Sequence, residues 1–378
     1  MKEALKKIDY PLLIATLILS AFGLLMVFSA SSVSSVLQYG STEYHFFTRQ
    51  AISLAVSLVL AAFIIRIPTT FYQKVNRLAL VGILGIMILL KMYGTFTNSA
   101  QSWFRIMGFS FQPSEFAKPI IILYLACLYG KKKKFNNIYD TLIPLIPCIV
   151  IFFMVAMEPD LGSASIIAII TMLIYFTLPF SKSKEVKLLK TVALVGGFGL
   201  ILLLNSGHAS SFLTSTQSSR FNFLKPCSRY LEETGYQVCN GYIAIHNGGI
   251  FGVGLGNSTQ KYLYLPESHT DFIFPIIVEE LGLIGGVAVF GMYLFILFRV
   301  LIIARNTKDL RGSIIAFGTF AFILVHITVN MGGLLALIPL TGVPLPFLSY
   351  GGSNLITLFI LLSLTQRVCI ESKTRKKV

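Results

Sequence analysis

Charged side chains are scarce in this sequence, since Asp, Glu, Lys and Arg make up 12% of its 378 residues while hydrophobic residues make up 55%. So little charge, with a mean hydropathy of +0.76, excludes an ordinary soluble globular domain and indicates a membrane protein.

The five cysteines lack the spacing of a metal site. Gly252, Gly254 and Gly256 lack a surrounding strand or βαβ unit, so we interpret them as turn residues, with a backbone nest for an anion as the alternative.

Apolar runs long enough to cross a bilayer recur along the whole chain, and clusters of Lys and Arg follow every second run. The net charge of +15 therefore describes orientation in a membrane and not a nucleic-acid surface. The first run has about 20 residues, which exceeds a signal-peptide core, so we predict a retained span. We predict one all-α polytopic membrane domain over residues 1–378, with about ten transmembrane helices and both termini in the cytoplasm. The predicted spans are residues 11–30, 47–65, 78–93, 114–130, 140–157, 161–179, 190–206, 272–298, 312–334 and 354–369.

The longest predicted connection, residues 207–271, is too long for a simple linker, because structureless loops of this length are usually functional or disordered. The charge pattern puts it outside the membrane as a large extracytoplasmic loop. Its second half mixes aromatic, amide and glycine residues, and we expect that half to fold against the membrane. Cys227 and Cys239 both lie in this loop. We predict two separate buried thiols, and a disulfide between them is the alternative.

The segment 338–354, IPLTGVPLPFLSYGGSN, places three prolines and three glycines between the last two predicted spans. Such a segment does not form an unbroken helix. Irregular backbone near membrane depth persists where it is buried in protein or lines a wet cavity. The segment therefore either helps to wall a pocket or forms a simple external turn, and the sequence leaves both open.

Acidic residues gather at the outer ends of the predicted spans, where a buried charge is expensive. Glu115 and Lys118, in QPSEFAK, are three residues apart on one helix face, so we expect them to pair, either for function or as a structural clamp. Asp271 directly precedes FIFPIIV, where it would either cap the helix or act as a general base in an external cavity. The acidic residues are Glu115, Glu158, Asp160, Glu267, Asp271, Glu279 and Glu280, and the basic residues on the same side are Arg105, Lys118, Arg220, Lys225, Arg229 and Lys261.

Four separated motifs, QPSEFAK, GYQVCNGYIAIHNGGIFGVGLGN, LPESHTDFIFPIIVEELG and PLTGVPLPFLSYGGSN, together resemble the SEDS family of bacterial cell-wall proteins, whose members include FtsW, RodA and SpoVE. The resemblance covers essentially the whole chain. It implies a peptidoglycan glycosyltransferase that polymerises lipid II at the outer face of the cytoplasmic membrane. The forms IDYPLL and IPLTGVPLPF resemble the Gram-positive FtsW branch and SWFRI resembles RodA, so we expect a role in division more than in elongation.

The resemblance also implies roles for individual residues. Asp271, in the HTDFIF motif, corresponds to the family's essential catalytic residue, and Glu115 and Lys118 correspond to residues that line its central cavity. The donor sugar carries a polyprenyl diphosphate that departs without a proton, so one carboxylate is enough, and Asp271 would accept the proton of the attacking hydroxyl. Cations or a bound divalent ion would balance the departing charge. The candidate substrate-binding residues are Glu115, Lys118, Arg220, Gln237, Lys261 and Glu267.

The expected partners follow from the same resemblance. They are the lipid-linked substrates, a class B penicillin-binding protein that supplies transpeptidation, and other divisome or elongasome proteins, without nucleic acid. Two other functions fit a polytopic protein with charged residues inside the membrane. One is a lipid II flippase, and the other is a non-enzymatic divisome scaffold.

Overall fold

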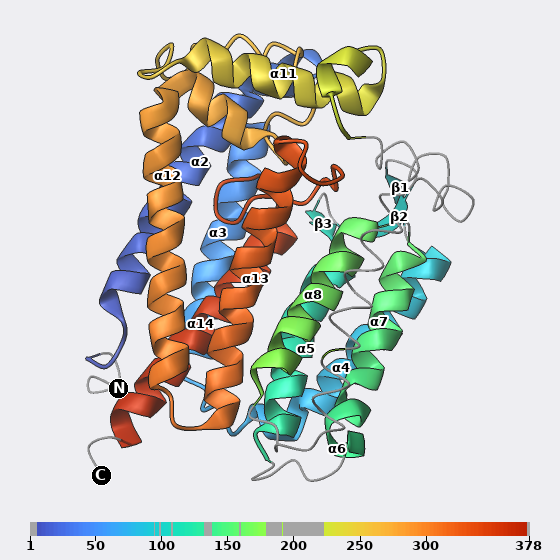
Figure 1. The fold of residues 1–378 in the computed structure, drawn as a ribbon, viewed down its shortest axis with the longest axis vertical. Coiled ribbons are helices and arrows are strands. Elements are labelled where there is room, and N and C mark those ends of the chain that lie inside the picture. Colours follow the sequence, from blue (N-terminus) through green and yellow to red (C-terminus); the bar gives the residue numbers. More distant parts are fainter. Residues whose placement is uncertain are drawn as a thin grey trace.

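The computed structural model describes residues 6–93, 95–97, 100–106, 109–131, 138–158, 160–178, 191 and 223–375. Within these residues, long helices run side by side as a bundle, and α11 lies across one end of it (Figure 1). Helix α2 begins and α14 ends at the opposite end of the bundle, where Lys7 Nζ donates to Thr374 Oγ1 at 3.0 Å. The two ends of the described chain therefore meet on the side away from α11.

The regular secondary structure of the described chain is mainly helical, as predicted. The exception is a small antiparallel sheet between α4 and α5, in which Thr95 pairs with Trp103 and Phe104 with Phe111. The helices are α2 (Tyr10–Leu37), α3 (His45–Ile64), α4 (Tyr72–Tyr93), α5 (Pro113–Tyr129), α6 (Ile138–Leu142), α7 (Ile146–Ala156), α8 (Leu161–Thr177), α11 (Glu233–Gly248), α12 (Ile273–Asn306), α13 (Leu310–Leu334) and α14 (Gly352–Arg375). The strands are β1 (Thr95–Thr97), β2 (Ala100–Ile106) and β3 (Phe109–Phe111), and 3-10 turns cover Ile143–Leu145 and Pro226–Arg229.

The chain is a multi-pass membrane protein. Among the described residues, seven helices are long and apolar enough to cross a membrane, and the shorter α8 is a further apolar helix. The predicted span 190–206 lies outside the described residues, so the total of ten spans stays a prediction. Of the other predicted spans, 140–157 coincides with α6, the 3-10 turn Ile143–Leu145 and α7 together, and the rest each coincide with one helix of the bundle.

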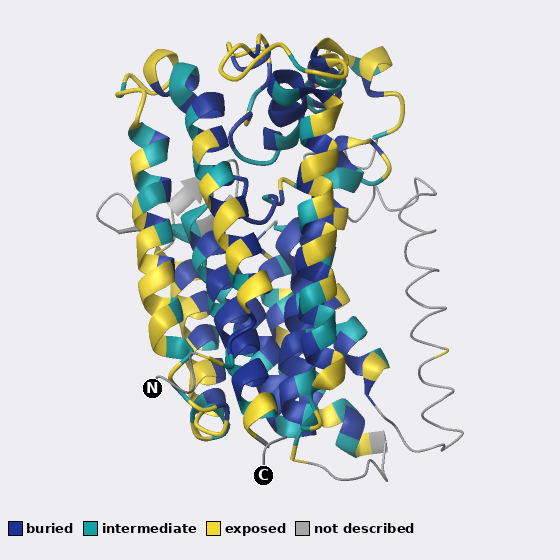
Figure 2. Ribbon diagram, turned by 90° about the vertical axis from the view of Figure 1, so that its left-hand side faces the viewer, coloured by how far each residue is buried: buried dark blue, intermediate teal, exposed yellow. Residues whose placement is uncertain are grey.

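Helices α13 and α14 form the centre of the bundle. In the most apolar 18-residue stretch of each helix, 72% of the residues are buried in α13 and 83% in α14, against 17% in α3 and 28% in α4. Figure 2 shows the same distribution, with buried residues inside the bundle and exposed residues along its outer faces. The outer helices therefore present apolar side chains to lipid, while α13 and α14 carry polar residues in the protein interior.

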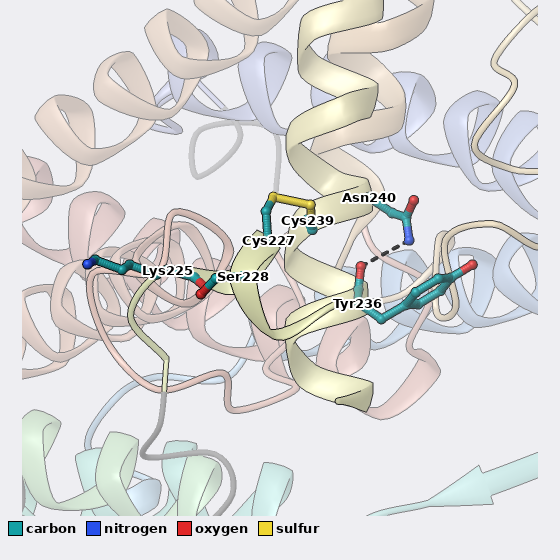
Figure 3. The surroundings of a disulfide bond; sticks show 6 residues. All are labelled: Lys225, Cys227, Ser228, Tyr236, Cys239 and Asn240. Atoms are coloured by element: carbon teal, nitrogen blue, oxygen red, sulfur yellow. Dashed lines mark hydrogen bonds between the residues drawn. A yellow bond between two sulfur atoms is a disulfide. The ribbon is translucent and has the colours of Figure 1, made fainter. Parts of the chain in front are cut away.

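The loop half that was expected to fold against the membrane packs onto the bundle through α11 and α12. Cys227 and Cys239 form a disulfide, with their Cα atoms 4.9 Å apart, so the prediction of separate thiols is wrong (Figure 3). The chain reverses after the 3-10 turn and brings the start of α11 against it. This reversal needs Gly235, because a Cβ there would lie 2.1 Å from the carbonyl oxygen of Arg229. The sequence showed two cysteines in one loop but not the reversal between them.

Candidate active site

Helix α12 is broken near its start, at Gly282, which has φ 72° and ψ −176°. The break frees the carbonyl groups of Glu279 and Glu280, and these accept hydrogen bonds from the N–H groups of Val253 and Gly254, both at 3.0 Å. A short segment, residues 273–281, is thereby separated from the long spanning part of the helix. This segment is held by the loop that precedes it, and its first residue follows the HTDF sequence directly.

The glycines of this loop serve its close contact with α12. A Cβ at Gly252 would lie 2.3 Å from the Glu280 carbonyl oxygen, and a Cβ at Gly282 would lie 2.2 Å from the Ile250 carbonyl oxygen. Gly252, Gly254 and Gly256 all have positive φ, which glycine adopts without strain. The N–H groups of residues 252–254 bond to protein carbonyls, which supports the interpretation of Gly252 and Gly254 as turn residues.

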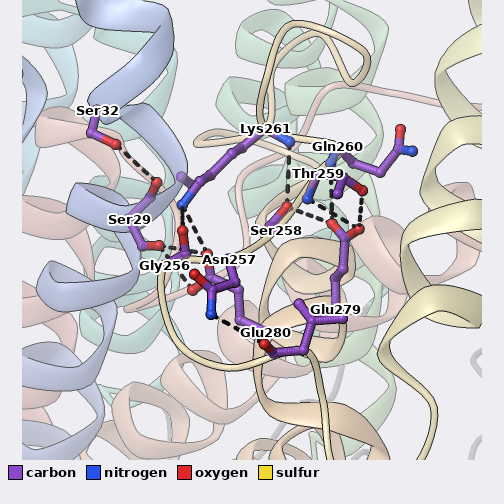
Figure 4. A network of polar contacts seen from close by, with 12 residues as sticks. Ser29, Ser32, Gly256, Asn257, Ser258, Thr259, Gln260, Lys261, Glu279 and Glu280 are labelled. Carbon is purple, nitrogen blue, oxygen red and sulfur yellow. Dashed lines mark hydrogen bonds and ion pairs between the residues drawn. The ribbon is translucent and has the colours of Figure 1, made fainter.

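Glu279 lies among hydrogen-bond donors from the same loop (Figure 4). Its carboxylate accepts from the hydroxyl groups of Ser258 and Thr259 and from the backbone N–H groups of Thr259 and Gln260, with Thr259 Oγ1 at 2.8 Å. Asn247 of α11 adds its Nδ2 at 3.2 Å. The side chain is completely buried, and these donors offset the cost of removing its charge from water.

Glu280 is paired with a hydroxyl and an ammonium group (Figure 4). Ser29 Oγ of α2 lies 2.6 Å and 2.8 Å from its two carboxylate oxygens, and Lys261 Nζ lies 3.3 Å from Oε1. The same ammonium donates to the Gly256 carbonyl oxygen at 2.5 Å. Glu279 and Glu280 therefore fasten the loop 256–261 to α12 and α2, which explains two carboxylates inside an apolar helix.

Asp271 and Glu267 meet at a hydroxyl group. Thr270 Oγ1 lies 2.9 Å from Asp271 Oδ1 and 2.8 Å from Glu267 Oε2. Phe272, and not Asp271, occupies the N-cap position of α12, so the expected N-cap position of Asp271 is not found. Asp271 is half-buried, and Glu267 is exposed.

His269 ties this loop to two other parts of the bundle. Its ring packs on Phe46 of α3 and Tyr350, with ring centroids 4.3 Å and 5.8 Å away, and its carbonyl oxygen accepts from the Tyr350 N–H at 2.8 Å. Burial lowers the pKa of His269 to about 4, against an opposing effect of Glu267. The imidazole is therefore neutral at pH 7, and it contributes packing without charge next to Thr270 and Asp271.

The segment 338–351 lies next to Asp271. Most of its residues are buried or half-buried, so it is not a simple external turn. Gly342 has φ +67°, and a Cβ at that position would lie 3.8 Å from Asp271 Oδ2. A Cβ at Gly162, the second residue of α8, would lie 2.9 Å from the carbonyl oxygen of Thr341. The segment thus lies between Asp271 and the first turn of α8.

The QPSE motif joins the same region. Gln112 Nε2 donates to Asp160 Oδ2 at 2.9 Å, and Asp160 caps α8 by accepting from the Ser163 N–H at 2.9 Å. The backbone N–H of Gln112 donates to Ser353 Oγ at 3.2 Å. Motifs that lie far apart in the sequence therefore meet at one end of the bundle, and the segment 338–351 links them to Asp271.

Glu115 and Lys118 pair as predicted, with Lys118 Nζ 2.6 Å from Glu115 Oε1. Asn354 Nδ2 donates to the other carboxylate oxygen at 3.3 Å. On the far side, Lys118 Nζ lies 3.2 Å from His326 Nε2, and His326 Nδ1 lies 2.8 Å from the Phe322 carbonyl oxygen. Because a carbonyl only accepts, Nδ1 carries the hydrogen and Nε2 accepts from the ammonium. No local pattern in the sequence pointed to His326 or Asn354 as members of this cluster.

The remaining predicted site residues are spread over several places. Gln237 lies half-buried on α11, and Arg220 lies outside the described residues. Lys118 and Lys261 both make buried ion pairs, so their contacts give no support to the prediction that they hold a departing diphosphate. Across the described part of the chain, His, Cys, Asp and Glu form no group of three or more that could hold a metal ion.

Glu158, in the turn between α7 and α8, is 3% exposed. Burial raises its pKa to about 8 from 4.5, Asp160 adds to the rise, and Lys91 opposes it. The folded protein then binds more protons than the unfolded chain between these pH values, so stability falls as the pH rises through that window. Glu158→Gln is expected to melt above wild type near pH 8 and close to it near pH 5. Melting curves across this range check the shift, and parallel curves for the two proteins would contradict it.

Known proteins resemble this chain over its full length. The model of the FtsW, RodA and SpoVE family, described as cell cycle proteins, matches residues 10–374. The chain is 39% identical to the probable peptidoglycan glycosyltransferase FtsW of Bacillus subtilis strain 168, over 100% of this chain and 95% of that protein. It is 33% identical to the stage V sporulation protein E of the same strain, over 97% of this chain and 98% of that protein.

Solved structures share the fold. A chain from a peptidoglycan synthase complex, described as coordinating polymerization and crosslinking, has a TM-score of 0.75 at 23% identity and covers 98% of this chain and 99% of its own. The rod shape determining protein RodA of Thermus thermophilus has a TM-score of 0.68 at 24% identity and covers 96% of each chain. The arrangement of motifs around Asp271, the family match and the full-length relatives lead to one conclusion: the chain belongs to the FtsW, RodA and SpoVE family of cell cycle proteins, the SEDS family that its motifs predicted.

Proposed function

We propose that this chain polymerises lipid II at the outer face of the bacterial cytoplasmic membrane, with Asp271 as the general base. It is a peptidoglycan glycosyltransferase, the activity named for its full-length relatives. The observation that supports Asp271 as the base is its place in the structure. It is half-buried at the end of the bundle where the motifs meet, and the side-chain-free backbone of Gly342 faces it.

The other acidic residues near this end are less suited to the role. Glu279 and Glu280 are completely buried and hold the loop 256–261. Glu115 is committed to Lys118, and Asp160 caps α8. A general base has to come within hydrogen-bond reach of the proton that it accepts, which a carboxylate enclosed by protein donors does not do.

The reaction needs one proton acceptor. The 4-hydroxyl oxygen of one lipid-linked sugar attacks the anomeric carbon of another, and Asp271 takes its proton as the new C–O bond forms. The bond from the anomeric carbon to the diphosphate oxygen breaks on the opposite face, and the lipid diphosphate leaves with the electron pair. Because a diphosphate is stable as an anion, no acid has to protonate it, in contrast to the two carboxylates of glycosidases. The configuration at the anomeric carbon inverts.

The membrane setting and the partner extend this proposal. Both substrates carry lipid tails, so they reach a site at the end of a helical bundle from within the bilayer. Both termini then lie in the cytoplasm, in accord with the basic clusters between the apolar runs.

The likeness to a chain of a peptidoglycan synthase complex supports a class B penicillin-binding protein as the partner for crosslinking. The similarity to FtsW supports a role in cell division.

The direct test is glycan synthesis by the purified chain from lipid II in detergent micelles. Flipping cannot contribute there, because no bilayer separates two compartments. Glycan strands that lengthen with time support the polymerase. A protein that moves lipid II across vesicles but makes no strands in detergent would be a flippase, and one that does neither would be a scaffold.

Glu115 and Lys118 are expected to act as a unit. Glu115→Gln leaves the buried ammonium of Lys118 without its counter-charge. The free energy of unfolding should therefore fall by about 3–5 kcal/mol, which is typical of a broken buried pair, and the melting temperature should fall with it. Changing both residues, to Gln and Met, is expected to recover part of that stability without restoring polymerisation. Melting temperatures and strand synthesis of the three variants check this. Full activity in the double variant would make the pair purely structural.

A further inference from the structure

Asn330 of α13 contacts the peptide group of Asp271, although the two lie 59 residues apart in the chain. Its Nδ2 donates to the Asp271 carbonyl oxygen at 2.9 Å and to the Val343 carbonyl oxygen at 2.8 Å. The residue is only 5% exposed. A side-chain amide has two N–H donors, and these two bonds use both of them.

The carbonyl group of Asp271 lies just outside α12. Phe272 is the N-cap of that helix, with φ −103° and ψ 21°, so the first intrahelical bond goes to the carbonyl group of Phe272 and not to that of Asp271. Asn330 therefore supplies a hydrogen bond that α12 does not make, to the peptide group of the residue that carries the carboxylate.

The second bond of Asn330 holds the backbone that faces this carboxylate. Val343 directly follows Gly342, whose added Cβ would lie 3.8 Å from Asp271 Oδ2. Two acceptors on one amide NH₂ group lie about 5 Å apart when each bond is about 2.9 Å long. One planar amide thus sets the spacing between the Asp271 peptide and the segment on the opposite side of its carboxylate.

We propose that Asn330 is a positioning residue for Asp271, which orients the carboxylate toward the open space at Gly342. The inference rests on the proposed function, in which Asp271 is the base. A base must lie within hydrogen-bond length of the acceptor hydroxyl. A misplacement of about 1 Å can lower a rate about 10²-fold. Asn330 acts through the backbone of Asp271 and of Val343, so its loss is expected to affect the chemical step more than substrate binding.

The test removes both donors of Asn330. Asn330→Leu keeps the branched shape of the side chain and has no N–H group. For lipid II polymerisation by the purified full chain in detergent, Asn330→Leu is expected to lower kcat about 10- to 100-fold with little change in KM.

Several outcomes would overturn the proposal. A kcat for Asn330→Leu within about twofold of wild type, even with a lower Tm, would leave Asn330 a structural residue. Asn330→Asp, which has the same shape and no N–H donor, is measured in its place if Asn330→Leu does not fold. Asp271→Asn is assayed in parallel. If it stays active, the proposed function fails, and if it is inactive while Asn330→Leu is normal, only the positioning role fails.

Discussion

Lys261→Met is expected to destabilise the protein strongly, because it leaves the completely buried carboxylate of Glu280 without its ammonium partner. Removing one partner of a buried ion pair costs about 3–5 kcal/mol, since the remaining charge stays out of water. The substitution also removes the bond to the Gly256 carbonyl group, so the loop 256–261 loses part of its attachment to α12. Thermal melting of the purified protein in detergent measures the effect.

Two controls separate this effect from a general loss of charge. The double variant Lys261→Met with Glu280→Gln removes the uncompensated charge and is expected to recover much of the lost stability. Arg229→Met breaks an ion pair with Glu232 in which the Glu232 side chain is 49% exposed, and exposed pairs contribute about 0–1 kcal/mol. A melting temperature of Lys261→Met equal to that of Arg229→Met would contradict the role assigned to the buried pair.

The helices of this protein could be predicted from sequence because each depends on a local property. A run of apolar residues long enough to cross a bilayer has few stable structures other than a helix. For this reason the predicted spans coincide with helices wherever the structure describes them. The pairing of Glu115 with Lys118 could be predicted for the same reason, since residues three apart share a helix face.

Features that depend on distant contacts could not be predicted. The break in α12 at Gly282 exists because the loop 249–254 supplies partners for the freed backbone groups. Ser29, which binds Glu280, lies 251 residues away in the chain. The Cys227–Cys239 disulfide depends on a chain reversal that no local pattern indicated. In each case the residues were visible, but the sequence did not show what they would contact.

The site was predictable in part. The resemblance of HTDFIF to a family motif pointed to Asp271, while local rules favoured a helix cap equally, and the structure places Phe272 at the cap position. Asn330 was missed, because no local pattern in the sequence links it to Asp271, which lies 59 residues away in the chain.

Asp271→Asn is expected to abolish almost all polymerisation while leaving the fold intact. Asn has the same shape, and its carbonyl oxygen can accept the hydrogen bond that Thr270 Oγ1 now makes to Oδ1. Because Phe272 occupies the N-cap position of α12, the substitution leaves the N-cap residue unchanged. What it removes is the proton acceptor, and loss of a general base lowers a rate on the order of 10²- to 10⁴-fold. Glu267→Gln, which changes the exposed carboxylate on the same hydroxyl, is expected to lose far less activity.

The central claim, that this chain builds glycan strands with Asp271 as the base, is tested most directly by strand length. Wild type, Asp271→Asn and Glu267→Gln are purified, and their melting temperatures are measured to check that all three are equally folded. Each is then given lipid II in detergent. The claim predicts long strands from wild type, shorter or fewer strands from Glu267→Gln, and almost none from Asp271→Asn. Strands of near-normal length from Asp271→Asn would contradict it.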